Sequence, residues 1–121
     1  MPQKKLANAI VGLLILQFVL GMLANLFSNV PSQKPYVVFR QFGFIAFHAL
    51  NAVALVVLAI VLLVKLHKSS EAKQAIGGLV NIVLAFIFGE LFVFTQRDIF
   101  SFLMALAFIG ALMSYARIAL T

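Results

Sequence analysis

Residues 47–63, FHALNAVALVVLAIVLL, decide the fold of this chain, because they contain no charged side chain and belong to a longer apolar run. That run, Phe39 to Leu66, exceeds the roughly 20 residues that a helix needs to cross the hydrocarbon core of a bilayer. Three more stretches are long enough: Ala7 to Phe27, Ala75 to Thr95 and Ile99 to Leu120. Because every backbone polar group must be satisfied inside the bilayer, helix is the only conformation open to them. The sequence therefore predicts an all-α integral membrane protein with four transmembrane helices.

The composition agrees with this class and excludes others. Of the 121 residues, 64% are hydrophobic and 10% are charged, and the mean hydropathy is +1.15. Soluble domains contain about 25% charged residues, and disordered chains are poor in aliphatic and aromatic side chains. A water-soluble globule and a disordered chain are therefore both excluded. The chain has no cysteine, which also excludes disulfides and thiolate metal sites.

The connections between the four stretches are short. Residues 28–38 contain Pro31 and Pro35 and are typical of a loop, residues 67–74 form a charged turn, and residues 96–98 form a tight hairpin. Short connections make consecutive helices antiparallel. We therefore predict a single domain, residues 1–121, folded as an up-down four-helix bundle.

The basic residues predict the orientation of this bundle. Six of them fall on the side of the two termini: Lys4, Lys5, Lys65, Lys68, Lys73 and Arg117. Three fall on the other side: Lys34, Arg40 and Arg97. Because basic residues concentrate on the cytoplasmic side, both termini of this multi-pass protein are expected in the cytoplasm, within the cell membrane. The net charge of +6 is then explained by the orientation of the protein in the lipid bilayer. The bilayer is the expected partner, and no nucleic acid is expected.

Polar side chains at membrane depth are the candidates for function, because they are costly there. On the first two helices they recur every three or four residues, which places them on one face of each helix. The candidates are Gln17, Gly21 and Asn25 on the first helix, Arg40, Gln41, His48 and Asn51 on the second, and Glu90 on the third. Asn25, His48 and Glu90 fall at a similar depth in the outer half of the bilayer. We therefore expect an outward-side pocket around His48.

The first half of the chain resembles one half of a haem A synthase. The resemblance lies in LQFVLGMLANLF, residues 16–27, followed by an external loop and by the helix that contains residues 47–63. It implies that Gln17 and Gly21 belong to a Gln-x-x-x-Gly helix and that His48 contacts haem as a metal ligand. Arg40 and Gln41 would then meet the haem propionates. The whole chain also resembles small four-helix bacterial membrane proteins of similar length.

The chain departs from the haem A synthase pattern in two ways. That family uses paired histidines on different helices, whereas His48 is the one histidine at membrane depth here. The carboxylate expected just after the first helix is also missing, and Asn25 and Ser28 stand there instead. The oxidation chemistry of the family is therefore not expected, whereas binding of a ligand is.

Three functions are compatible with this pattern. The first is binding of a haem- or quinone-like cofactor, with His48 as axial ligand or hydrogen-bond donor. The second is a small oligomeric transporter or channel that uses Glu90 and His48. The third is an accessory subunit of a larger membrane complex, docked through the small residues Gly77, Gly78, Ala85 and Gly89. Enzymatic activity has the least support, and the polar residues could also serve as hydrogen bonds between helices.

Overall fold

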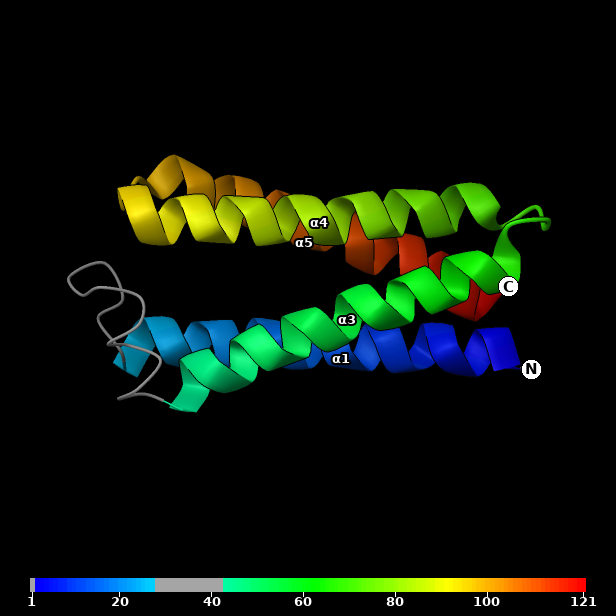
Figure 1. Ribbon diagram of the computed structural model, residues 1–121, viewed down its shortest axis with the longest axis horizontal. Coiled ribbons are helices and arrows are strands. Elements are labelled where there is room, and N and C mark those ends of the chain that lie inside the picture. The colour runs from blue at the N-terminus through cyan, green and yellow to red at the C-terminus, as the bar shows by residue number, and fades with distance from the viewer. Residues whose placement is uncertain (1, 28–42) are drawn as a thin grey trace.

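The computed structural model describes the backbone of residues 2–27 and 43–121, and helices make up nearly all of it. Helix α1 spans Pro2–Phe27, α3 spans Gly43–Leu66, α4 spans Ala72–Thr95 and α5 spans Asp98–Leu120 (Figure 1). These ranges contain no strand. The all-α prediction is confirmed.

The four helices form an antiparallel up-down bundle. Helix α1 packs against α3 and α5, and α4 packs against the same two helices, so that α1 and α4 lie diagonally across the bundle. Figure 1 shows the N-terminus, the C-terminus and the α3–α4 turn together at one end, which we call the terminal end. The α4–α5 turn lies at the opposite end, which we call the hairpin end. This is the predicted topology.

The helix ends match the predicted spans more closely than the helix starts do. All four apolar runs end where the helices end, at residues 27, 66, 95 and 120. Helix α1, however, starts at Pro2 instead of Ala7, and α4 starts at Ala72 instead of Ala75. The added residues include lysines and glutamines, which are good helix formers and extend a helix beyond the hydrocarbon into water. The first residues of the predicted second span, 39–42, lie outside the described residues.

Two tight turns join the last three helices. At the terminal end, the backbone N–H of Ser69 donates to the Leu66 carbonyl (2.8 Å), and the Ser69 hydroxyl accepts from the Glu71 N–H (3.1 Å). At the hairpin end, Gln96 adopts a left-handed conformation with φ 59°, and its N–H donates to the Phe92 carbonyl (2.7 Å). These turns hold α4 antiparallel to both α3 and α5.

The buried core occupies one half of the bundle. Twelve buried side chains form it: Ala7, Ile10, Leu14, Leu55, Ala59, Leu62, Leu66, Ala75, Ile82, Ala111, Tyr115 and Ile118. Each lies in the half of its helix that is closer to the terminal end. In the hairpin half, a stacked pair joins α1 to α5, with the rings of Phe18 and Phe108 centred 5.5 Å apart. The terminal half is thus the more tightly packed part of the described structure.

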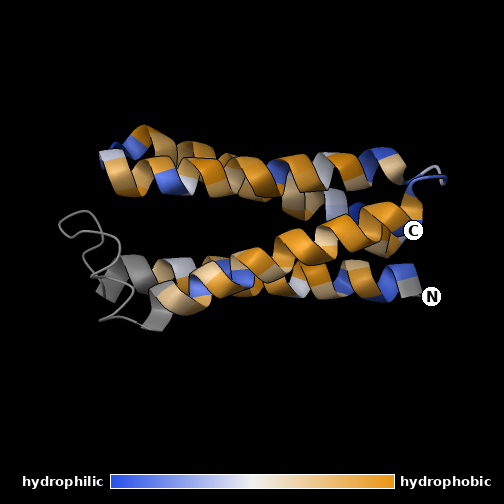
Figure 2. Cartoon of the chain, viewed as in Figure 1, coloured by the Kyte–Doolittle hydropathy of each residue, from blue (hydrophilic) through white to orange (hydrophobic). Residues whose placement is uncertain are grey.

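The outer surface of the bundle is apolar, as contact with lipid requires. Figure 2 shows hydrophobic residues along the outward sides of all four helices. Large side chains such as Leu50, Val64 and Phe94 are about two-thirds exposed, with values of 65%, 64% and 68%. All four helices are long and apolar enough to cross a membrane. We conclude that the chain is a multi-pass membrane protein.

Candidate functional site

A chain of hydrogen bonds connects α1 and α3 in the hairpin half of the bundle. The side-chain amide of Asn51 donates both to the Leu13 carbonyl and to Gln17 Oε1, each at 2.9 Å. Gln17 Nε2 lies 3.3 Å from His48 Nε2. Asn51 is buried, with 9% of its surface exposed, and Gln17 and His48 are partly buried. We call Gln17, His48 and Asn51 the polar cluster.

The hydrogen bonds of the polar cluster fix the tautomer of His48. The Leu13 carbonyl can only accept, so the Asn51 side chain must present its NH₂ group there. The same NH₂ group donates to Gln17 Oε1, which leaves Gln17 Nε2, a donor, facing the imidazole. Because an amide nitrogen cannot accept, His48 Nε2 accepts this bond, and the proton of the neutral ring lies on Nδ1.

The Nδ1 atom of His48 is buried and has no hydrogen-bond partner among the described residues. A buried N–H group without a partner costs about 1–3 kcal/mol. Such groups are rare in folded proteins, and each usually marks a bound water, a ligand or a functional constraint. The polar cluster therefore holds one donor that the described part of the protein leaves unused.

Gly21 makes room for the imidazole. A Cβ atom built on Gly21 would lie 3.1 Å from His48 Cε1 and 3.5 Å from Nδ1. A contact of 3.1 Å is tighter than about nine in ten real Cβ contacts, so the absence of a side chain lets α3 bring the ring against the α1 backbone. The space that Gly21 opens is thus filled by the ring of His48 itself.

The structure brings together four of the eight predicted site residues: Gln17, Gly21, His48 and Asn51. Glu90 is not among them, because its side chain is exposed on α4 and makes no hydrogen bond to His48 in the described part of the chain. The side chain of Asn25, and Arg40 and Gln41 altogether, lie outside the described residues. The predicted convergence of Glu90 with His48 is therefore not seen in the part of the site that can be described.

Sequence reasoning did not identify the Leu13 carbonyl as part of the site. This carbonyl anchors Asn51 and thereby orients both other members of the polar cluster. Leu13 lies one turn before Gln17, on the same stripe of α1, so its position was available from the spacing. A backbone carbonyl inside a helix carries no signal in the sequence that it accepts a second hydrogen bond.

The polar cluster does not fit haem in the arrangement described. An axial ligand needs a ring nitrogen with a free lone pair facing the iron, but the Nε2 lone pair accepts from Gln17. The other nitrogen, Nδ1, carries the proton in this tautomer and therefore has no lone pair to offer. No group of three or more histidine, cysteine or acidic side chains in the described ranges could hold a metal ion. Ligation of haem would require Gln17 to turn away from His48.

The small residues of α4 lie against α5. A Cβ atom on Gly78 would come within 2.5 Å of the Tyr115 ring, which is fully buried, and one on Gly89 would lie 3.1 Å from Met104 Sδ. Asn81 donates to the Gly77 carbonyl of its own helix (2.9 Å). The surface predicted to dock a partner subunit is therefore largely covered by the chain itself.

Comparisons with protein-family models, with curated proteins and with solved structures found no match for this chain. The resemblance of its first half to haem A synthase thus has no support from these comparisons. The function must be argued from the geometry of the polar cluster.

Proposed function

We propose that the polar cluster binds a lipophilic, quinone-like molecule from the membrane, with His48 as the hydrogen-bond donor. The observation that carries this proposal is the buried Nδ1–H of His48, which has no acceptor among the described residues. The ligand would present a carbonyl oxygen about 2.9 Å from Nδ1, the usual distance of such a bond. The rest of the ligand would be largely apolar, because the neighbouring Met22 and Phe47 are exposed on the lipid-facing surface.

The alternative role, a set of hydrogen bonds that hold α1 and α3 together, explains only part of the cluster. Asn51 already joins the two helices through the Leu13 carbonyl and Gln17 Oε1, and His48 adds only an acceptor for Gln17 Nε2. Hydrogen bonds between transmembrane helices contribute only about 0.6 kcal/mol on average. An imidazole that accepts one such bond, and whose buried Nδ1–H has no acceptor in the described part of the chain, is a poor means of stabilisation. This imbalance favours a ligand.

The hairpin half of the bundle offers a lipophilic molecule a way in. Phe47 and Met22, next in sequence to His48 and Gly21, are 63% and 57% exposed on the lipid-facing surface. His48 lies five residues into α3, about 7.5 Å along the helix axis from its start. A molecule dissolved in the bilayer could therefore reach the cluster sideways, with no passage through the packed terminal half.

The direct test is binding of a decyl-substituted benzoquinone to the purified protein in mild detergent, followed by calorimetric titration. We expect His48→Ala to weaken binding about two- to ten-fold, since a neutral hydrogen bond contributes about 0.5–1.5 kcal/mol. His48→Asn should recover part of the loss, because the asparagine amide places an N–H near the position of Nδ1. His67→Ala is the matched control, since His67 is exposed in the α3–α4 turn. Equal binding by all four proteins, or none by the wild type, would refute the proposal.

Haem binding by His48 is the second form of this proposal and requires the Gln17 side chain to rotate away. Its support is the buried imidazole together with the resemblance of residues 16–27 and 47–63 to haem A synthase. An absorption spectrum of freshly purified protein distinguishes the two forms. A Soret band that disappears in His48→Ala would favour haem over a quinone-like ligand.

The transporter and accessory-subunit hypotheses have weaker support. Transport through Glu90 and His48 would need the two groups on one path, whereas the Glu90 side chain is exposed on α4. Docking to a larger complex, or to further copies of the chain, would need a surface other than the glycines that face α5. Proteoliposome flux that falls in Glu90→Gln would revive the transporter hypothesis.

We also propose that the protein lies in the cell membrane with both termini in the cytoplasm. Its support is that the six basic residues of the terminal side lie on elements that meet at one end of the bundle (Figure 1). With this orientation, the polar cluster lies at the depth of the outer leaflet.

A further inference from the structure

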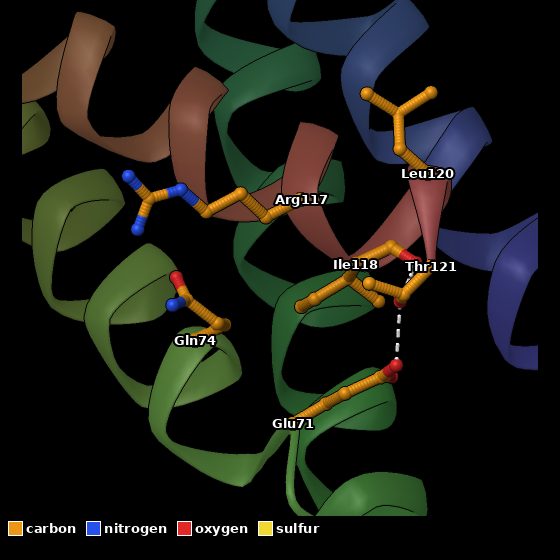
Figure 3. A pocket seen from close by; sticks show the side chains of 6 residues that line it. All are labelled: Glu71, Gln74, Arg117, Ile118, Leu120 and Thr121. Carbon is orange, nitrogen blue, oxygen red and sulfur yellow. Dashed lines mark hydrogen bonds between the residues drawn. The ribbon is translucent and has the colours of Figure 1, made fainter.

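A pocket opens at the terminal end of the bundle, far from the polar cluster. It has a volume of about 360 Å³ and lies between the start of α4 and the end of α5. Six residues line it: Glu71, Gln74, Arg117, Ile118, Leu120 and Thr121 (Figure 3). Two of them, Ile118 and Leu120, are apolar, and the four polar ones fall into two separate groups.

The two polar groups have different roles. Figure 3 shows Arg117 and Gln74 on one side of the pocket, with the amide oxygen of Gln74 on the side of the Arg117 guanidinium. On the other side, Glu71 Oε1 accepts a hydrogen bond from the Thr121 hydroxyl at 2.6 Å. The carboxylate is thus engaged with Thr121, whereas the guanidinium lies beside an amide that brings no charge. The guanidinium of Arg117 carries a positive charge and a planar set of N–H donors, which suits an oxyanion with several acceptor oxygens.

The electrostatic surroundings of this pocket also favour an anion. Six of the nine basic residues lie at the terminal end, whereas two of the three acidic residues, Glu90 and Asp98, lie near the hairpin end. The pocket borders both the N-terminus of α4 and the C-terminus of α5, so the two helix dipoles oppose each other there, and the excess of basic residues is what favours an anion. Glu71 lies at the N-cap position of α4 and makes no capping hydrogen bond through its side chain.

The position of the pocket matches the headgroup layer of a bilayer. It lies where two transmembrane helices reach water, and Leu120 at its edge is 87% exposed. Basic pockets between helices on the cytoplasmic side are typical sites for anionic lipid headgroups. We propose that Arg117 binds a phosphate group here, supplied by an anionic phospholipid or by a soluble phosphate ester. This site is independent of the polar cluster and of its ligand.

Native mass spectrometry of the full chain in mild detergent tests this proposal. Phosphatidylglycerol and phosphatidylcholine with identical acyl chains are added separately, and the fraction of lipid-bound protein is measured. We expect the wild type to retain phosphatidylglycerol in preference, and Arg117→Gln to weaken that binding roughly ten-fold, as loss of a charge-assisted bond implies. Arg117→Lys should fall in between, since it keeps the charge but loses the planar fork.

Two controls separate the pocket from general charge attraction. Lys73→Gln removes a charge from the same end but not from the pocket lining, and Arg97→Gln removes one from the hairpin end. Both should bind lipid like the wild type, and circular dichroism checks that every variant is helical. If Lys73→Gln loses as much binding as Arg117→Gln, or if Arg117→Gln loses none, the proposed site is wrong.

Competition identifies the source of the phosphate group. Inorganic phosphate at millimolar concentration is added to the complex with phosphatidylglycerol. Displacement that depends on Arg117 would support a soluble phosphate ester as the ligand, whereas retention of the lipid would support the headgroup. No retention of either probe by the wild type would overturn the proposal.

Discussion

The imidazole of His48 lies against the bare backbone of Gly21, at a distance that leaves no room for a side chain. A Cβ atom on Gly21 would come 3.1 Å from His48 Cε1, whereas one on Gly12, two and a half turns earlier on the same helix, would have nothing within 4 Å. The contact between α1 and α3 therefore requires glycine at position 21, whereas position 12 could hold a larger residue.

Gly21→Ala should destabilise the protein, because the added methyl group must push the His48 ring away. Overpacking of this kind costs about 1–3 kcal/mol. Gly12→Ala is the matched control and should leave stability unchanged or slightly raised, since alanine is the better helix former. Thermal unfolding in detergent, followed by circular dichroism, compares the two. Equal midpoints would show that His48 does not pack on Gly21.

Asn51→Ala should cost more than Asn81→Ala. Asn51 donates across the bundle to Leu13 and Gln17, so its loss removes two hydrogen bonds between α1 and α3. At about 0.6 kcal/mol each, the expected cost is about 1 kcal/mol. Asn81 donates only to Gly77 of its own helix, so Asn81→Ala should have a smaller effect. The same unfolding measurement decides the order, and a reversed order would contradict the network described.

Gly78→Ala should be the most destabilising of the glycine substitutions in α4. The new methyl group would lie 2.5 Å from the fully buried Tyr115 ring, which has no space to retreat into. We expect a loss of about 3 kcal/mol, at the upper end for overpacking. Gly77→Ala, its neighbour, meets only the Ser114 hydroxyl at 3.7 Å and should be tolerated. Similar unfolding midpoints for both variants would argue against the observed packing of α4 on α5.

The orientation can be tested by labelling, because the chain has no cysteine of its own. Ser70→Cys reports on the terminal end and Gln96→Cys on the hairpin end, and both positions are exposed. With both termini in the cytoplasm, a maleimide that cannot cross membranes should label only Gln96→Cys in intact cells. Both variants should be labelled after permeabilisation. Labelling of Ser70→Cys in intact cells would reverse the orientation.

Much of the fold follows from the sequence, because length and apolarity alone determine a transmembrane helix. The four runs end at the residues where the helices end, and short turns impose the antiparallel order. The apolar runs begin later than α1 and α4 do, because lysine and glutamine continue a helix into water. Hydropathy gives no signal for those added turns.

The candidate site could be predicted only in part. The spacing of Gln17 and Gly21 on one helix, and of His48 and Asn51 on the next, predicts two polar faces, and the structure joins them. The rotation of α4 could not be predicted, since a helix that is apolar on nearly all sides has no face that must turn inward. The direction of Glu90, a residue of α4, could therefore not be predicted, and its side chain is exposed.

The central claim is that His48 offers an Nδ1–H group to a ligand, and nitrogen NMR of histidine tests it most directly. The chain contains two histidines, so a protein labelled with ¹⁵N-histidine, compared with its His67→Gln variant, gives an assigned signal for His48. The account predicts that His48 is the Nδ1-protonated tautomer and that its Nδ1 resonance shifts when the decyl-substituted benzoquinone is added. An Nε2-protonated ring, or a His48 spectrum that the quinone leaves unchanged, would contradict it.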